Sequence, residues 1–177
     1  MSVSKSEKLK DHISPLLSAM RDFSDQSVQE QLEKILVPEC QIKMCFPFGT
    51  IKGAENYFGT TYKPLLRAFP NLERRDLIIL AGETPEGPDW VACMGNYFGT
   101  FVSSFLDILP TGQLAHMRFH EFYRFDKEKI VEIQAIWDLP ELMMQSNSWP
   151  MAPQLGRFMC TPGPISGDGL YLSLIHI

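Results

Sequence analysis

Glu121 is the residue of this sequence best suited to acid–base chemistry, because it lies among aromatic residues in a hairpin pattern. Residues 118–125 (RFHEFYRF) and 130–138 (IVEIQAIWD) alternate between polar and apolar side chains, with a charged turn between them. This alternation predicts two strands that share one apolar face. Glu121 would lie on that face between Phe119 and Tyr123, where burial raises the pKa of a carboxyl group towards neutral pH. Alternatively, Glu121 is a pocket-wall or interface carboxylate that an arginine neutralises and that takes no part in chemistry.

Asp138, at the end of the second strand, is the other candidate for a catalytic acid or base. The segment Asp138-Leu139-Pro140-Glu141 also has the form of an acidic capping box, in which the Asp138 carboxylate accepts backbone N–H groups at a helix start. The two roles nearly exclude each other if the cap uses both carboxylate oxygens.

The register of the hairpin decides which residues face Glu121. A loop of even length would place Glu121 beside Gln134 and Asp138, whereas a loop of odd length would place it beside Ala135 and Trp137. The residue pattern alone leaves both registers open.

Aromatic and amide side chains on the same predicted strands could line a pocket around a bound molecule. Some of these side chains would form its apolar walls, and others would donate hydrogen bonds to a ligand carbonyl. The predicted ligand-binding residues are Asn96, Tyr97, Phe119, Tyr123 and Trp137.

His116 and His120 resemble a metal-binding pair, but their spacing argues against a shared ion. Four residues along a strand span about 13 Å, whereas two zinc ligands at about 2.0–2.1 Å each must lie much closer together. We predict no metal site and place both histidines on the outer face of the sheet with Arg118 and Arg124, opposite Glu121.

Composition excludes several classes of function. The 177 residues are 45% hydrophobic and 21% charged, which predicts one globular domain. The net charge of -5 comes without a cluster of Lys or Arg, so we expect no nucleic-acid partner. No apolar run suits a signal peptide or a membrane span, and the four cysteines lack a CxxC pattern, so we expect a reduced, cytoplasmic protein. We expect no cofactor, because no phosphate loop, dinucleotide fingerprint or nucleophile elbow is visible.

In the first part of the chain apolar residues recur at helical spacing, and further along the chain polar and apolar residues alternate as in strands. This order predicts an α+β fold with N-terminal helices packed on one face of a curved antiparallel or mixed sheet and a cavity between the layers. Pro15 predicts a break in the first helix, and Ser27 is expected to cap the second. Gly95 and Gly99 predict bulges or bends in a long strand. The predicted helices are 4–23, 27–37, 54–69 and 138–145, and the predicted strands are 41–48, 72–80, 90–106, 118–125 and 130–138.

The last residues of the chain, 147–177, differ in composition from the rest. Residues 147–171 are rich in proline and glycine, which predicts a linker or an arm. Residues 172–177 (LSLIHI) can be encoded by CTG-TCT-CTT-ATA-CAC-ATC, which resembles a transposon-end adapter of sequencing libraries. We interpret 172–177 as an artefact of a metagenomic fragment and leave it out of the fold argument.

Short motifs along the chain resemble the SnoaL-like polyketide cyclase family, within the nuclear-transport-factor-2-like superfamily. The similarity extends from about Leu9 to Gly156, and we take 1–146 as the domain. The motifs are Gly53-Ala54-Glu55, AFPNL at 68–72, YFGTF at 97–101, PTG at 110–112, HEF at 120–122, and KIVE at 129–132 followed by Asp138 and Gln145.

The resemblance implies a conical barrel with a ligand pocket and a homodimer formed through the outer face of the sheet. In these cyclases an aspartate late in the final strand is the acid–base group, and a histidine on the preceding strand assists. Aligned without a gap, the aspartate position falls at Ala135 and the histidine position at Glu121, so this chain departs from the cyclase pattern at both. The same alignment favours the odd register. Residues 162–170 look like a bridge into another domain, so the chain also resembles the first domain of a truncated tandem.

Two hypotheses for function follow. The first is a cofactor-free enzyme of cyclase or isomerase type, acting by proton transfer on an apolar, carbonyl-bearing substrate. Glu121 would be its acid or base, with Tyr123, Asn96 or Tyr97 as hydrogen-bond donors, and Glu121→Gln should remove activity with little loss of stability. The second is a non-catalytic ligand-binding or dimerisation domain that has lost the cyclase aspartate, with Ala135 in its place.

Overall fold

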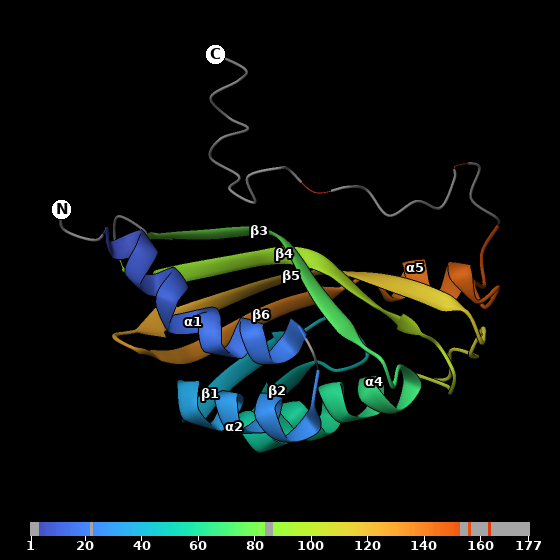
Figure 1. The fold of residues 1–177 in the computed structure, drawn as a ribbon, viewed down its shortest axis with the longest axis horizontal. Coiled ribbons are helices and arrows are strands. Elements are labelled where there is room, and N and C mark those ends of the chain that lie inside the picture. The colour runs from blue at the N-terminus through green and yellow to red at the C-terminus, as the bar shows by residue number, and fades with distance from the viewer. Residues whose placement is uncertain (1–3, 22, 84–86, 153–155, 157–162, 164–177) are drawn as a thin grey trace, which may run out of the picture.

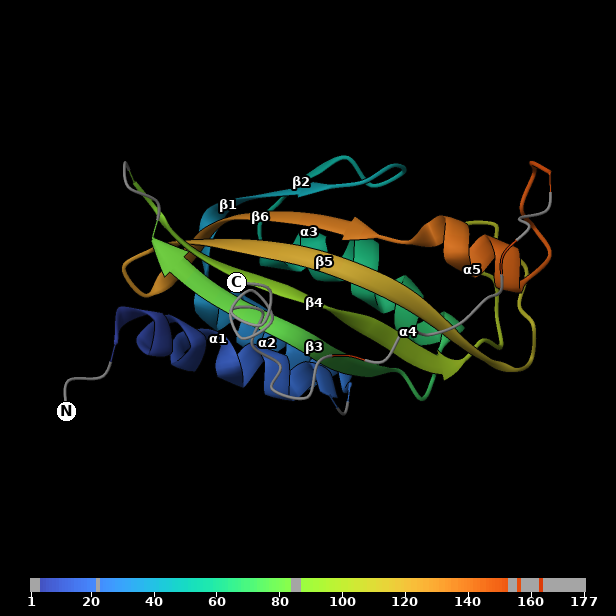
Figure 2. The same cartoon turned by 90° about the horizontal axis from the view of Figure 1, so that it is seen from above.

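The computed structural model describes residues 4–21, 23–83 and 87–152 together with Gly156 and Gly163, and it has the predicted α+β architecture. Helices α1 to α4 cover one face of a curved sheet, and α5 lies at one end of it (Figure 1, Figure 2). Most of the predicted linker and all of 172–177 lie outside the described residues. The elements are α1 (Lys5–Arg21), α2 (Asp25–Ile35), β1 (Leu36–Met44), β2 (Thr50–Lys52), α3 (Ala54–Tyr57), the π-helical turn η1 (Phe58–Tyr62), α4 (Lys63–Ala68), β3 (Glu73–Glu83), β4 (Asp89–Thr100), β5 (Leu114–Asp126), β6 (Lys129–Trp137) and α5 (Leu139–Gln145).

The sheet is mixed and has six strands in the order β2-β1-β6-β5-β4-β3. All neighbouring strands are antiparallel except β1 and β6, which are parallel. Strands β3 to β6 form a continuous antiparallel meander, so residues far apart in the sequence meet on its inner face. This face, covered by the helices, contains the core (Figure 2).

Helix α1 continues through Pro15, contrary to the predicted break. An internal proline removes a backbone hydrogen bond and costs about 3 kcal/mol or more. The opposite side of the helix buries several apolar side chains against the sheet, each contributing roughly 1.5–3 kcal/mol, so packing outweighs the proline. These buried side chains are Leu9, Ile13, Leu16, Leu17 and Met20.

Helix α2 begins one turn before the predicted cap. Ser24, in an extended conformation, accepts a hydrogen bond from the backbone N–H of Ser27, so Ser24 and not Ser27 is the N-cap. The preceding residue, Phe23, packs against Tyr62 and Tyr97. This tertiary contact fixes where the chain enters the helix, which the local sequence did not show.

Strand β4 ends at Thr100, earlier than predicted, and residues 101–112 form a loop with one isolated bridge between Phe105 and Ile108. The predicted bulge lies in the neighbouring strand: the β3–β4 register shifts between Asp76 and Ile78, whereas the β4–β5 register is regular. A Cβ atom at Gly95 would lie 2.0 Å from a backbone oxygen of β3. The glycine is therefore needed for the close approach of the two backbones.

Candidate functional site

Glu121 lies on the helix-covered face of β5, between Cys93 of β4 and Ala135 of β6. At the hairpin turn Asp126 pairs with Lys129, so the loop itself has even length. A register shift after Arg124 then displaces the pairing by one residue. The odd register at Glu121 is thus confirmed, but it results from an even loop combined with a bulge.

The Glu121 carboxylate accepts four hydrogen bonds from buried side chains. Oε2 accepts from Arg74 Nη1 at 2.6 Å and from the Tyr123 hydroxyl at 2.5 Å. Oε1 accepts from the Tyr97 hydroxyl at 3.1 Å and from Trp137 Nε1 at 2.9 Å. Glu121 is 0% exposed. We call these five residues the Glu121 cluster, and they use essentially all the acceptor capacity of the carboxylate.

The prediction of a raised pKa for Glu121 is wrong. Burial by itself would raise the pKa, but the Arg74 guanidinium and the hydrogen bonds from Tyr123, Arg74 and Trp137 outweigh it and hold the pKa below its ordinary value. Glu121 is therefore a buried anion, neutralised by an arginine, as in the alternative interpretation of the sequence.

Arg74 is the member of the cluster that the sequence analysis missed. Its guanidinium donates to Glu121 and, through Nε and Nη2, to Asp76, and it lies 4.0 Å from the centre of the Phe119 ring. A signal was present in strand alternation, because Arg74 has the same parity as Leu72, which is buried. The charge of Arg74 argued against predicting that it is buried, since an arginine is almost never fully buried unless it is paired.

A second aromatic layer lies next to the cluster. Tyr62 packs against Trp137 with ring centres 5.6 Å apart, and its hydroxyl lies 3.0 Å from that of Tyr57. On another side Trp137 contacts Phe48 at 5.6 Å, and Phe48 in turn contacts Phe105 of the 101–112 loop at 6.5 Å. The chain of ring contacts therefore runs from the loop to the carboxylate.

The other predicted site residues divide between the two faces of the sheet. Tyr97, Phe119, Tyr123 and Trp137 lie on the inner face with Glu121. Asn96 pairs with Arg118 and lies on the outer face, because successive residues of a strand point to opposite sides. This placement separates Asn96 from Glu121, and a role for Asn96 in ligand binding stays a prediction.

Asp138 caps α5, as the capping-box interpretation predicted. Its Oδ1 accepts the backbone N–H of Glu141 at 3.1 Å. Helix α5 then brings Glu141 to β5, where its carboxylate accepts the backbone N–H of Arg118 at 3.2 Å and lies 3.1 Å from His116 Nε2. Asp138 thus positions a helix, and Glu121 and Asp138 are not brought together by a shared hydrogen bond.

Comparison with protein families identifies this fold. The family described as SnoaL-like polyketide cyclase matches residues 15–146. The chain belongs to the SnoaL-like polyketide cyclase family. A comparison with curated proteins gave no match.

Solved structures share the fold of this family member at low sequence identity. AclR from Streptomyces galilaeus is 21% identical with a TM-score of 0.67, over 84% of this chain and 87% of its own. A SnoaL-like protein from Jannaschia sp. CCS1 is 18% identical with a TM-score of 0.67, over 85% and 99%. IdmH from Streptomyces antibioticus is 22% identical with a TM-score of 0.63, over 79% and 99%.

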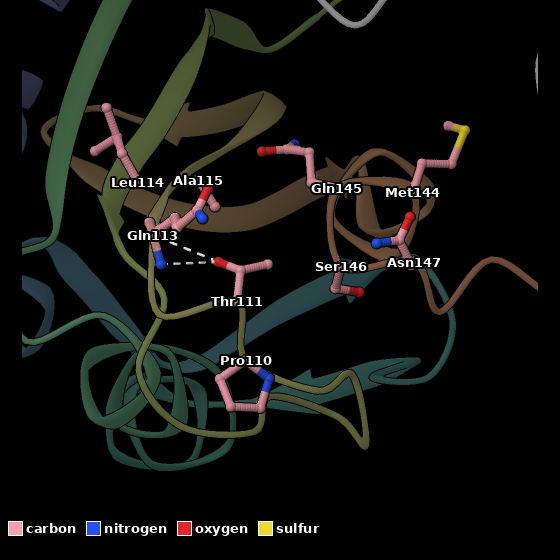
Figure 3. Close-up of a pocket in the computed structure, with 9 residues that line it drawn as sticks. All are labelled: Pro110, Thr111, Gln113, Leu114, Ala115, Met144, Gln145, Ser146 and Asn147. Atoms are coloured by element: carbon pink, nitrogen blue, oxygen red, sulfur yellow. Dashed lines mark hydrogen bonds between the residues drawn. The ribbon is translucent and has the colours of Figure 1, made fainter.

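Glu121 lines none of three surface hollows that described residues of this SnoaL-like chain form, although Arg74 of the Glu121 cluster lines the one beside the start of β3. One of about 610 Å³ lies between the start of β5 and the end of α5, where Thr111 and Gln113 are joined by hydrogen bonds (Figure 3). Two others, of about 200 Å³ and 380 Å³, lie beside α2 and beside the start of β3. Around Glu121 itself, packed side chains fill the space where the sequence predicted a cavity. Among the described helices none is long and apolar enough to cross a membrane.

Proposed function

We propose that this SnoaL-like chain binds an apolar, carbonyl-bearing small molecule between the sheet and the helices, and that Glu121 does not act as acid or base. The observation that carries the proposal is the state of Glu121, whose two oxygens each accept two hydrogen bonds from buried side chains. A general base must come within about 2.6–3.2 Å of the proton that it removes. Protein donors already occupy that distance around Glu121.

Electrostatics supports the same conclusion. A carboxylate whose pKa lies below its ordinary value is a weak base at neutral pH, because the proton that it accepts is lost readily. Protonation would also leave Arg74, which is 1% exposed, without the charge of its main partner. A buried unpaired charge costs several kcal/mol, so proton transfer to Glu121 opposes the stability of the fold.

The neighbouring positions offer no substitute for Glu121. Ala135, opposite Glu121, carries only a methyl group at the position that the resemblance gives to the cyclase aspartate. Asp138 is engaged at the start of α5 by the backbone N–H of Glu141. At these positions the inner face therefore keeps the scaffold of the family without a free acid or base.

We place the access route at the 101–112 loop and the β1–β2 turn. Phe48 contacts Trp137 there and is itself contacted by Phe105, and Val102 and Leu109 of the same loop expose large apolar side chains. Leu106 and Asp107 have positive φ angles of 50° and 65°, which for side chains other than glycine indicates local strain. A strained apolar loop that rearranges would admit a ligand to the aromatic layer.

Enolisation of a simple ketone tests the proposal. 2-Acetylnaphthalene is added to the protein in D₂O; binding is followed by tryptophan fluorescence, and exchange of its methyl protons by NMR. We expect saturable binding and an exchange rate equal to that in buffer with heat-denatured protein. Acceleration of exchange by the folded protein would overturn the non-catalytic assignment, and lack of binding would overturn the ligand class.

We also propose a homodimer formed through the outer face of the sheet, in the cytoplasm. Phe122 and Ile136, which are 41% and 59% exposed, lie on this face of β5 and β6. The free thiols of Cys40, Cys45 and Cys93 suit a reducing compartment. Sedimentation equilibrium should give twice the chain mass, and Ile136→Glu should give a monomer; a monomeric wild type would rule out the dimer.

A further inference from the structure

The hydroxyl groups of Tyr57 and Tyr62 lie 3.0 Å apart, next to the Glu121 cluster and outside its hydrogen bonds. We infer that this tyrosine pair is the binding site for the carbonyl oxygen of a neutral ligand. The inference rests on the proposed function and names the group that the protein recognises. Three observations support it: the hydrogen-bond inventory, the helical turn that carries the pair, and the charge nearby.

The hydrogen-bond inventory leaves one donor of the pair unused. A tyrosine hydroxyl has a single proton to donate. Tyr97 and Tyr123 both donate theirs to Glu121. Tyr57 and Tyr62 have two protons between them and share one hydrogen bond, and no acceptor for the second proton occurs among the described residues.

The unused donor is completely buried, since Tyr57 and Tyr62 are both 0% exposed. A buried donor without an acceptor destabilises the folded state. A ligand oxygen that accepted this proton would remove the cost, and this gain adds directly to its affinity.

A π-helical turn brings the two hydroxyls together. In an α-helix, with 3.6 residues per turn, residues five apart lie on different sides. In η1 the backbone N–H of Lys63 bonds to the carbonyl of Phe58, five residues earlier, which widens the turn so that Tyr57 and Tyr62 share one side. The Thr61 hydroxyl donates to the carbonyl of Tyr57 at 2.6 Å and holds the turn in place.

The turn is independent support for a binding role. π-Helical residues make up well under 1% of proteins, and single π-turns occur frequently at functional sites. An ordinary α-helix would have satisfied the backbone here equally well. What the π-turn adds is the juxtaposition of the two hydroxyls.

The charge of Glu121 selects the kind of oxygen that can bind. Burial is the main reason why the pKa of Tyr62 lies well above its ordinary value, and the nearby Glu121 anion raises it further. The pKa of Tyr57 is raised by burial, by Tyr62 and by Glu121. Both phenols therefore remain neutral donors. The same anion repels a carboxylate or an enolate, so a neutral ketone or quinone carbonyl is the favoured ligand group.

The pair is reached through the access route described above. The Tyr62 ring contacts Trp137, and Trp137 contacts Phe48. A flat apolar ligand that displaces Phe48 and Phe105 would meet the Trp137 ring, and its carbonyl oxygen could then approach the hydroxyl pair.

The test compares 2-acetylnaphthalene with 2-ethylnaphthalene, which has similar shape and no oxygen. Either hydroxyl can supply the spare proton, so the decisive variant is the double substitution Tyr57→Phe and Tyr62→Phe. We expect wild type to prefer the ketone, and the double variant to lose roughly 2- to 10-fold of that preference while its affinity for 2-ethylnaphthalene stays within about twofold. The carbonyl stretching frequency of the bound ketone should fall in wild type and not in the double variant.

The outcomes separate the two proposals. Equal preference for the ketone in wild type and double variant, with the same carbonyl frequency, would overturn the tyrosine-pair site and leave the proposed function standing. Failure of wild type to bind either naphthalene would overturn the proposed function, and this inference with it. Should the double variant melt well below wild type, both proteins are compared at a temperature at which the double variant is still folded, and an equal carbonyl frequency there would still overturn the tyrosine-pair site.

Discussion

Two buried glutamates meet strand β5 in opposite ways. Glu121 belongs to the strand and points to the inner face, where four side-chain donors from β3, β4, β5 and β6 surround it. Glu141 comes from α5 and reaches β5 beyond the end of β6, where it bonds to the backbone N–H of Arg118 and contacts His116. The first acid depends on the whole sheet, and the second on one short helix.

The comparison shows what each acid does for the fold. Beyond Trp137 the Asp138 N–H still donates to the Arg118 carbonyl at 2.9 Å. From there α5 supplies side chains in place of a strand: Gln145 also accepts from and donates to the backbone of His116. Glu121 satisfies no backbone group in this way and instead balances the charge of Arg74. Removing Glu121 should therefore damage the core, whereas removing Glu141 should loosen one end of the sheet.

The largest expected effect is that of Glu121→Gln. This change leaves the buried Arg74 with Asp76 as its remaining charged partner, and breaking a buried ion pair costs about 3–5 kcal/mol. We expect the free energy of unfolding in urea to fall by that amount, in contrast to the small change that the sequence analysis anticipated. A loss below about 1 kcal/mol for Glu121→Gln would contradict the ion-pair role.

Tyr123→Phe should have the next largest effect. The Tyr123 hydroxyl donates to the charged Glu121 carboxylate, and such hydrogen bonds contribute about 1.5–3 kcal/mol. Tyr57→Phe is the matched control, because it loses a bond between two neutral hydroxyls, worth about 0.5–1.5 kcal/mol. Urea unfolding of both variants measures the difference, and equal losses would show that the Glu121 cluster has no special strength.

Glu141→Gln should cost about 1–2 kcal/mol and should change the pH dependence of stability. Burial alone would raise the pKa of Glu141, but the contacts with His116 and Arg118 outweigh it and lower the pKa. A lowered folded-state pKa gives stability above the ordinary value of 4.5 that is lost as the pH falls through the folded-state pKa. From pH 7 to pH 3 the free energy of unfolding should thus fall less steeply in Glu141→Gln than in wild type. Glu121, whose pKa is also lowered, should account for much of the fall that remains. Parallel plots of the free energy of unfolding against pH for the two proteins would exclude a contribution from Glu141.

The smallest effect is expected for Asp138→Ala, at about 1 kcal/mol, because it removes the N-cap of α5. Asp138→Asn keeps a good cap and serves as control. Hydrogen exchange should show faster exchange of the His116 and Arg118 amides in the alanine variant, because α5 holds their acceptors. Unchanged exchange would mean that α5 stays in place without its cap.

The hairpin of β5 and β6 shows how far prediction from sequence could go. Alternation placed Glu121 with Phe119 and Tyr123 on one buried face, because side-chain direction in a strand depends only on parity. The neighbour of Glu121 on β6 could not be derived from loop length, since the bulge after Arg124 reverses the parity that the even loop sets. A bulge depends on packing across the sheet and leaves little trace in local sequence.

The sequence by itself determined the α+β order of elements, the burial of Glu121 and the cap at Asp138, all of which follow from short-range periodicity and local hydrogen bonds. Only the tertiary structure decided that Arg74, on a strand distant in sequence, neutralises Glu121, and that a π-turn joins the hydroxyls of Tyr57 and Tyr62. The reason is that the free energy of a buried charge depends on which groups surround it in space. The order of the strands in the sheet, and not the spacing of residues along the chain, determines which groups surround the charge.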